Sequence, residues 1–260
     1  MKLQLFQADA FTSRLFKGNP AAVVPLDEWL SDEILQQIAV ENNLSETAFF
    51  IPENDHFHIR WFTPKTEVNL CGHATLATAH ILFNELNFKD EAISFNSQSG
   101  ILTVVKTGDK LQLDFPADLV NSEEMNPDFS KALGAQPIAE FKGRTKHLLL
   151  FESEESIRNM RPNFHLLKQT DARGIIVTAK GTTVDFVSRF FAPKVGIDED
   201  PVTGSAHTLL VPFWSEKLNK KELTALQLSD RGGQLWCTLS GDRVLIAGHA
   251  VTYLKGEIEI

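Results

Sequence analysis

The chain has 260 residues, 43% of them hydrophobic, and a formal net charge of −9 at pH 7. This acidic balance argues against binding of nucleic acid, which needs clustered Lys and Arg. No stretch approaches the ~18 apolar residues of a membrane-spanning helix, and the first residues lack the pattern of a secretory signal. We therefore expect a cytoplasmic protein with no nucleic-acid or membrane partner, in which Cys71 and Cys237 are reduced.

The first half of the chain predicts a strand-rich domain. Residues 1–11 alternate apolar and polar side chains as a strand does, and GNPAAVV (18–24) indicates a turn that leads into a second strand. Ser31 is a suitable N-cap for a helix that runs to about Glu41. Glu46 stands where a polar loop passes into the apolar strand that begins at Ala48. Further elements are predicted as a strand at 57–62, a helix at 73–86, and strands at 92–95, 101–105 and 110–115.

The second half follows the acidic stretch 118–128, which we interpret with Pro116 as a linker. Pro212 lies inside the predicted helix after Gly204 and is expected to kink or shorten it. Strands outnumber helices, which favours antiparallel sheet in each half with one long helix per domain and disfavours a TIM barrel. The other predicted elements are short helices near 129–133 and 164–168, and strands at 147–151, 174–179, 223–228, 233–239, 243–246 and 250–260.

One phrase occurs twice in the sequence, as F-x-x-R-x-F-x-P-K. The copies begin at Phe57 and Phe186, so their arginines, Arg60 and Arg189, are 129 residues apart, about half the chain. This separation is far longer than any solenoid repeat. We predict two similar domains, at 1–116 and 117–260, with the closing strand able to return to the first.

Each copy of the phrase ends in a strand-breaking proline, and a glycine then opens a helix at Gly72 or Gly204. The first turn of a helix has free N–H groups and the positive end of the helix dipole. Two such starts facing each other would hold an anion, most simply a carboxylate. Burial in a duplicated core explains the apolar positions of the phrase. For the polar residues beside the glycines we favour a function.

Several common chemistries have no support in the sequence. There is no P-loop, no glycine-rich dinucleotide fingerprint and no G-x-S-x-G elbow. Cys71 and His73 form a C-x-H pair, but a single pair is weak evidence for zinc, which needs more ligands. We predict no metal and no cofactor, which leaves acid–base chemistry.

Three polar residues are candidates for that chemistry. Glu46 precedes the apolar run TAFFI, and an apolar wall makes a carboxylate a better proton acceptor; from the pattern alone a solvated strand edge is the commoner outcome. Asp200 lies in an acidic loop before Gly204, where a solvated turn is the plain alternative. Counting back four residues from each glycine gives Asp200 in the second copy and Val68 in the first, so this acid is particular to the second half. His73 fits equally well as a core residue or as a donor to an acidic substrate.

Four segments, GNPAAVV, SETAF, CGHAT and DPVTGSA, together resemble the PhzF family of phenazine-biosynthesis-like proteins in order and spacing. The resemblance covers essentially the whole chain, including the closing region GHAVTYLKGEI. It implies the diaminopimelate epimerase-like fold, an α+β structure with two similar domains. Each would be an antiparallel or mixed, barrel-like sheet wrapped round a central helix, with the active site in the cleft between the domains.

The resemblance also implies cofactor-independent proton transfer. In the phenazine enzyme a glutamate moves a proton on a cyclic dihydroxy-diene carboxylate, and family members are homodimers. Matching the motifs makes Glu46, His73 and Asp200 catalytic, with Glu46 as the base and Asp200 acting with His73. It makes a second group of residues substrate-binding: Gly72, Gly204 and Ser205.

The chain departs from the wider superfamily at one position. Epimerases and proline racemases of this fold place a cysteine before each helix-start glycine. Here Cys71 fills the first position but Thr203 fills the second, and a threonine hydroxyl cannot replace an acidic thiol. One-base isomerisation therefore fits better, with Cys71 a small packed residue. The alternatives are an amino-acid or hydroxyproline-type epimerase that uses Cys71, and a non-catalytic protein that binds a small acid.

Overall fold

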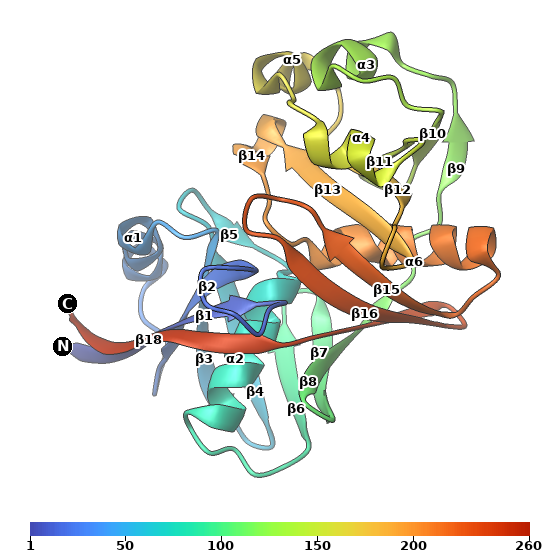
Figure 1. Cartoon of the computed structure of the whole chain (residues 1–260). Helices are drawn as coiled ribbons and strands as arrows, with labels where there is room; N and C mark the ends of the chain where they lie inside the picture. Colours follow the sequence, from blue (N-terminus) through green and yellow to red (C-terminus); the bar gives the residue numbers. More distant parts are fainter. The chain divides into compact units, whose positions relative to one another are not determined.

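The computed structural model describes residues 1–260, which divide into two compact units (Figure 1). Unit 1 contains Met1–Asp114 and Ile246–Ile260, and unit 2 contains Phe115–Leu245. The closing strand, which the sequence placed at the end of the second domain with a possible return to the first, pairs antiparallel with the first strand of the chain. None of the helices is long and apolar enough to cross a membrane.

The elements of the first part of the chain are β1 (Lys2–Ala10), β2 (Asn19–Pro25), α1 (Asp32–Asn42), β3 (Glu46–Glu53), β4 (His56–Phe62), β5 (Glu67–Val68), α2 (Gly72–Asn84), β6 (Ala92–Ser97), β7 (Gly100–Thr107) and β8 (Lys110–Pro116). Next come β9 (Asn121–Glu123), α3 (Pro127–Leu133), β10 (Ala139–Lys142), β11 (His147–Leu150), α4 (Glu154–Asn159), α5 (Phe164–Gln169), β12 (Ile175–Lys180) and β13 (Phe186–Ala192). The chain closes with the 3₁₀ turn η1 (Pro193–Val195), β14 (Ile197–Glu199), α6 (Gly204–Leu218), β15 (Glu222–Gln227), β16 (Gly233–Ser240), β17 (Arg243–Gly248) and β18 (Ala250–Glu259).

The two units repeat one pattern of strand pairing. In unit 1 the strands pair in the order β18, β1, β2, β3, β4, β6 and β7, then β8, and only β2–β3 and β4–β6 are parallel. In unit 2 the order is β9, β10, β11, β12, β13, β15 and β16, and only β11–β12 and β13–β15 are parallel. The short strands β5 and β14 add to β4 and β13 at matching places. The duplication therefore extends over the sheet of each unit, well beyond the repeated phrase.

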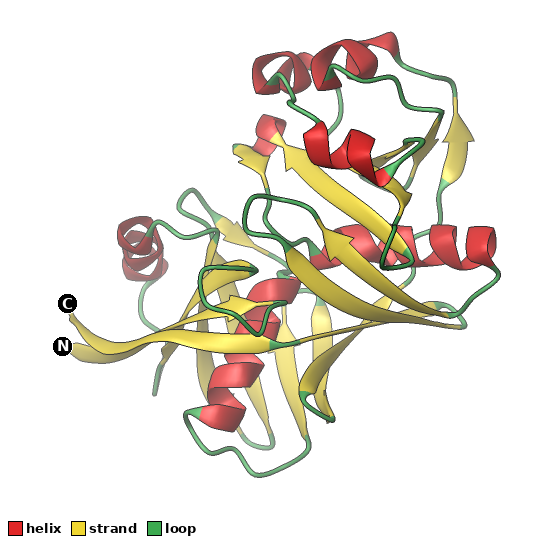
Figure 2. Ribbon diagram, in the orientation of Figure 1, coloured by secondary structure: helices red, strands yellow, loops and turns green.

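Each unit has one long helix among its strands, α2 in unit 1 and α6 in unit 2 (Figure 2). The side chains of α2 are buried on every face of the helix from His73 to Phe83, with His80 the half-buried exception. A helix that is apolar all round is a core helix. The α2 helix contacts β1, β2, β3 and β18, so its start is fixed by the strands around it. The predicted central helix is confirmed.

Most predicted elements of the first half are confirmed, including α1 with Ser31 as its N-cap, whose hydroxyl accepts from the N–H of Ile34. The predicted linker contains a strand, because β9 lies inside it and pairs with β10. Six short elements were not predicted: β5, β9, β10, α4, η1 and β14.

Pro212 does not shorten α6, which continues to Leu218. A proline lacks the N–H that would bond to the carbonyl four residues earlier, here that of Thr208. That carbonyl instead accepts from the N–H of Asp118, at 3.0 Å. The buried segment at Asp118 therefore supplies the hydrogen bond that the helix cannot make itself.

Candidate active site

The arginine of each repeated phrase holds the loop that leads into the helix start. In unit 1, Nε and Nη2 of Arg60 donate to the two carboxylate oxygens of Glu67, both at 2.8 Å. In unit 2, Arg189 makes the same two-point pair with Glu199, at 2.7 and 2.8 Å. Both glutamates precede their helix-start glycine by five residues, a match that the sequence analysis missed. The arginines therefore set the position of the loops and are structural residues.

Glu46 and His73 meet in unit 1. Glu46 is the first residue of β3, beside Ala21 of the parallel strand β2, and His73 is the second residue of α2. Oε2 of Glu46 lies 3.1 Å from Nε2 of His73, and the two side chains are only 12% and 6% exposed. The angles are not those of an aligned hydrogen bond, so the contact is an ion pair in this geometry. Two of the predicted catalytic residues are thus neighbours.

The other ring nitrogen of His73 has two neighbours of its own. Nδ1 lies 3.2 Å from Nδ2 of Asn19, a buried residue at the start of β2. It also lies 3.5 Å from Sγ of Cys71, the residue before the helix. From the sequence, Asn19 was expected to be part of a turn, with no function. A signal was present, because Asn19 is a polar residue at the head of an otherwise apolar strand.

Burial disfavours the charged form of His73, but the interactions with Cys71 at Nδ1 and with Glu46 at Nε2 outweigh burial and raise the pKa of His73 well above 6.5. Burial, together with the Glu46 carboxylate, raises the pKa of the Cys71 thiol to about 11. A thiol with that pKa is protonated at neutral pH, so the Glu46 carboxylate is the anion that keeps His73 charged. The pair thus provides a carboxylate able to accept a proton in a nearly dry site.

Glu46, Cys71 and His73 are also the types of residue that bind metals, and one ligand atom of each lies within 4.8 Å of the others. The imidazole ring, however, turns Nε2 toward the carboxylate and Nδ1 toward the thiol. A metal ion bound by His73 would contact one ring nitrogen, so the carboxylate and the thiol would both have to lie on that side of the ring. The arrangement fits a chain of proton donors and acceptors better than a metal site.

The helix-start glycines are the first residues of α2 and α6. Neither preceding residue, Cys71 or Thr203, caps its helix with its side chain. First-turn N–H groups without a side-chain cap suit an anion. Ser205 is exposed in the first turn of α6. The expectation that the two helix starts hold one anion stays a prediction.

Asp200 takes part in a hydrogen-bond network at the start of α6. Its carboxylate accepts from the hydroxyl of Thr203 at 2.5 Å. The buried side chain of Gln227 accepts from the N–H of Thr203 at 2.9 Å and donates to the carbonyl of Asp200 at 2.8 Å. The loop before Gly204 is therefore held by hydrogen bonds from Thr203 and Gln227.

A further buried histidine, His207, was not singled out in the sequence. Its Nδ1 donates to the carbonyl of Thr203 at 2.8 Å, and Nε2 is buried without a hydrogen-bond partner. In unit 1 the hydroxyl of Thr75 bonds in the same way to the carbonyl of Cys71, at 2.6 Å. In each unit, therefore, the carbonyl of the residue before the helix-start glycine accepts a hydrogen bond from a side chain one helical turn later. Burial lowers the pKa of His207 to about 4.

We expect acid to destabilise the protein through His207. Its pKa is depressed in the folded state, so between pH 6.5 and 4 the unfolded chain binds more protons, and stability falls as the pH falls through this window. By pH 4 the loss should be about 3 kcal/mol. His207→Asn keeps a donor for the carbonyl of Thr203 and removes the titration, so its unfolding free energy should vary less over this range. Urea unfolding at several pH values measures both proteins, and equal slopes would contradict the prediction.

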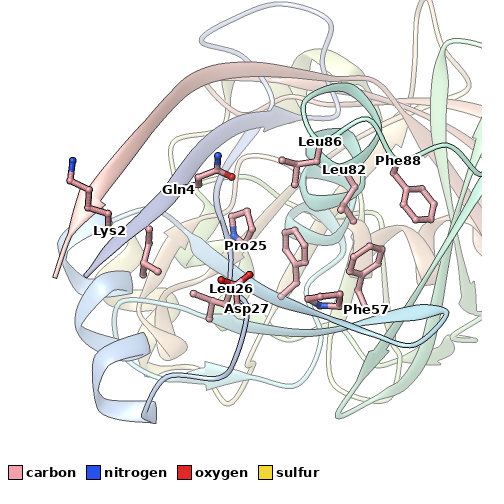
Figure 3. Close-up of a pocket in the computed structure, with 12 residues that line it drawn as sticks. Lys2, Gln4, Pro25, Leu26, Asp27, Phe57, Leu82, Leu86 and Phe88 are labelled. Carbon is pink, nitrogen blue, oxygen red and sulfur yellow. The ribbon is translucent and has the colours of Figure 1, made fainter.

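The pocket drawn in Figure 3 lies at the other end of α2. It has a volume of about 460 Å³, and Leu82 and Leu86 line it together with Phe57 and Phe88. At 1.5 Å per residue, Leu82 is about 14 Å along the helix from His73. This pocket is therefore separate from the Glu46–His73 pair.

Comparison with known proteins gives consistent results. A family model described as "Phenazine biosynthesis-like protein" matches residues 8–256. An uncharacterized isomerase of Pseudomonas aeruginosa is 53% identical over 260 residues, with 100% of each chain covered. The crystal structure of a PhzF-family phenazine biosynthesis protein from Enterococcus faecalis superposes with a TM-score of 0.98 at 46% identity, again with 100% of each chain covered.

A more distant structure carries information on the fold alone. A hydroxyproline epimerase from Agrobacterium vitis, with trans-4-hydroxy-L-proline bound, matches with a TM-score of 0.67 at 10% identity, over 99% of this chain and 92% of its own. Together with the PhzF structure, it confirms the predicted α+β fold of the diaminopimelate epimerase type. The full-length matches and the repeated sheet-and-helix units lead to one conclusion: the chain belongs to the PhzF family of phenazine biosynthesis-like proteins.

Proposed function

We propose that this protein is a cofactor-independent isomerase that moves a proton on a small cyclic carboxylic acid, with Glu46 as the general acid/base. The observation that carries the proposal is the Glu46–His73 contact, at 3.1 Å, between two side chains that are nearly buried. A relative that is 53% identical is named an uncharacterized isomerase, which agrees with this reaction class. The substrate and the homodimer implied by the family resemblance stay predictions.

The proposed reaction needs one side chain that first removes a proton from the substrate and then returns it. The carboxylate of Glu46 removes a proton from one carbon of the substrate, so a C–H bond breaks and an O–H bond forms. The resulting carboxylic acid returns the proton to another carbon of the same conjugated system, and the double bond moves between them. His73 stabilises the carboxylate before the first transfer and stabilises it again after the second. The start of α2 at Gly72 offers N–H groups for the substrate carboxylate.

Solvent deuterium tests this proposal. The protein is incubated in D₂O with a panel of acids that includes hydroxylated cyclohexadiene carboxylates, proline and 4-hydroxyproline, and products are followed by NMR and mass spectrometry. A moved double bond with deuterium at a new carbon supports isomerisation. Binding of an acid without any deuterium incorporation supports the alternative of a binding protein and contradicts the proposal. Small molecules released by denaturing the purified protein should be added to the panel.

The second candidate is an epimerase that uses Cys71, and the fold shared with the hydroxyproline epimerase keeps it open. Two observations disfavour it. The Cys71 thiol is buried with a pKa raised to about 11, and Thr203 stands where the second thiol would be. The same assay separates the two, because an epimerase inverts a carbon without moving a double bond. Cys71→Ala should abolish such an inversion and largely spare an isomerisation.

We expect Asp200 to orient the substrate or carry a proton without being the primary base. Asp200→Asn keeps an oxygen that accepts from Thr203, so the loop should stay folded while kcat falls by about 10²-fold, a typical contribution of one acid–base group. Asp198→Asn is a matched control, because it makes the same change at an exposed position two residues earlier. Steady-state kinetics and thermal melting measure both. Equal turnover of the two variants would show that Asp200 has only a structural role.

A further inference from the structure

Asn19 is held in one place by the backbone around it. It is fully buried at the head of β2 and pairs with Ala10 of β1. The preceding residue, Gly18, has a φ of +65°, and a side-chain carbon there would lie 2.1 Å from the carbonyl oxygen of Ala10. Only glycine satisfies both conditions. The chain thus enters β2 in a single conformation, which brings the amide of Asn19 to Nδ1 of His73 at 3.2 Å.

The orientation of the Asn19 amide determines which nitrogen of the neutral His73 ring carries the proton. With its nitrogen toward His73, the Asn19 amide can only donate, so Nδ1 must accept and the neutral ring has its proton on Nε2, facing Glu46. With the amide turned by 180°, its oxygen faces Nδ1 and accepts a proton from the charged ring. Asparagine therefore satisfies both charge states of His73. The thiol of Cys71, at 3.5 Å from the same nitrogen, is a weaker partner.

We infer that Asn19 is a positioning residue, whose amide directs the proton of neutral His73 to Nε2 and turns to accept from Nδ1 when the ring is charged. Glu46 and Cys71 are the titratable groups that contact the ring. The importance of Asn19 for catalysis rests on the proposed function, in which Glu46 alternates between its charged and neutral forms. A partner that serves both states of His73 keeps the buried Nδ1 paired at either stage.

Asn19→Asp leaves a side chain that can accept a hydrogen bond from Nδ1 of His73 but cannot donate one. A carboxylate can only accept, so it should hold the proton on Nδ1 and keep the ring charged. The chain offers a matched control in α2, where Nδ2 of Asn84 lies 3.0 Å from Nδ1 of the half-buried His80. Asn84→Asp makes the same chemical change beside a different histidine, outside the Glu46–His73 site.

The test uses the full-length protein labelled with ¹⁵N-histidine. NMR spectra that correlate ring nitrogens with ring protons identify the protonated nitrogen across a pH series. In Asn19→Asp, His73 should keep both nitrogens protonated to a pH about one unit or more higher than in the parent. Its kcat should fall about tenfold or more with little change in KM, since proton transfer and not binding is affected. Asn84→Asp should shift the His80 titration and leave the His73 spectra and kcat unchanged.

An unchanged His73 titration in Asn19→Asp would overturn the inference. The same spectra of the parent protein are a second test, which does not depend on whether a variant folds. At a pH where His73 is neutral, its proton must be on Nε2, and a proton on Nδ1 would overturn the inference as well. Neither spectrum depends on turnover. If the parent exchanges deuterium into no acid, the proposed function fails, while the spectra still decide the role of Asn19.

Discussion

Glu46→Gln is expected to lower deuterium exchange into the substrate by about 10³-fold, within the range for loss of a general acid/base. Glutamine keeps the size and the hydrogen-bonding oxygen of the side chain but cannot take up a proton. Because the neutral amide resembles the protonated acid, ligand binding and the thermal midpoint should stay close to those of the parent. The exchange assay in D₂O, combined with calorimetric titration of the same acid, separates the two effects.

The control for this variant is Glu53→Gln, at the other end of the same strand. Glu53 contacts His56 at 3.1 Å, so it is also a glutamate beside a histidine, but its side chain is 42% exposed. Its replacement should leave exchange unchanged. If Glu46→Gln still exchanges protons at nearly the parent rate, the base lies elsewhere, and Cys71 would be the first residue to test next.

Local signals in the sequence predicted much of the fold. The alternation of β1, the cap at Ser31 and the two helix-start glycines each depend on a few neighbouring residues, and each is found in the structure. The elements that were missed are short. The four residues of β10 cannot show a period, and they form a strand because β9 and β11 pair on either side.

The candidate site was only partly predictable for a related reason. Glu46 and His73 could be named because family motifs contain them, but their contact depends on the parallel pairing of β2 and β3 and on the burial of α2, which no local pattern specifies. Asn19 was read as part of a turn because its neighbours are glycine and proline. Its contact with His73 joins residues 54 positions apart in the chain.

Arg189→Met is expected to destabilise the protein by about 3–5 kcal/mol, the usual effect of removing one partner of a buried ion pair. The Arg189 side chain is 8% exposed, and that of Glu199, which would lose its partner, is 19% exposed. Nη1 of Arg189 also donates to the carbonyls of Ile157 and Met160, at 3.2 and 2.8 Å, so two acceptors near the end of α4 would each lose one of their donors. Methionine fills much of the space but replaces none of these bonds.

The duplicated fold supplies the control, since Arg60→Met removes the equivalent residue in unit 1. Glu67 there keeps a hydrogen bond from Gln98 at 3.0 Å, and the other partner of Arg60, Asp32, is 79% exposed and can be hydrated. The loss of stability should therefore be smaller than for Arg189→Met. Adding Glu199→Gln to Arg189→Met should recover part of the loss, because it removes the buried unpaired charge. Urea unfolding of the four proteins measures these differences, and an Arg60→Met variant at least as unstable as Arg189→Met would show that burial does not determine the strength of the repeated pair.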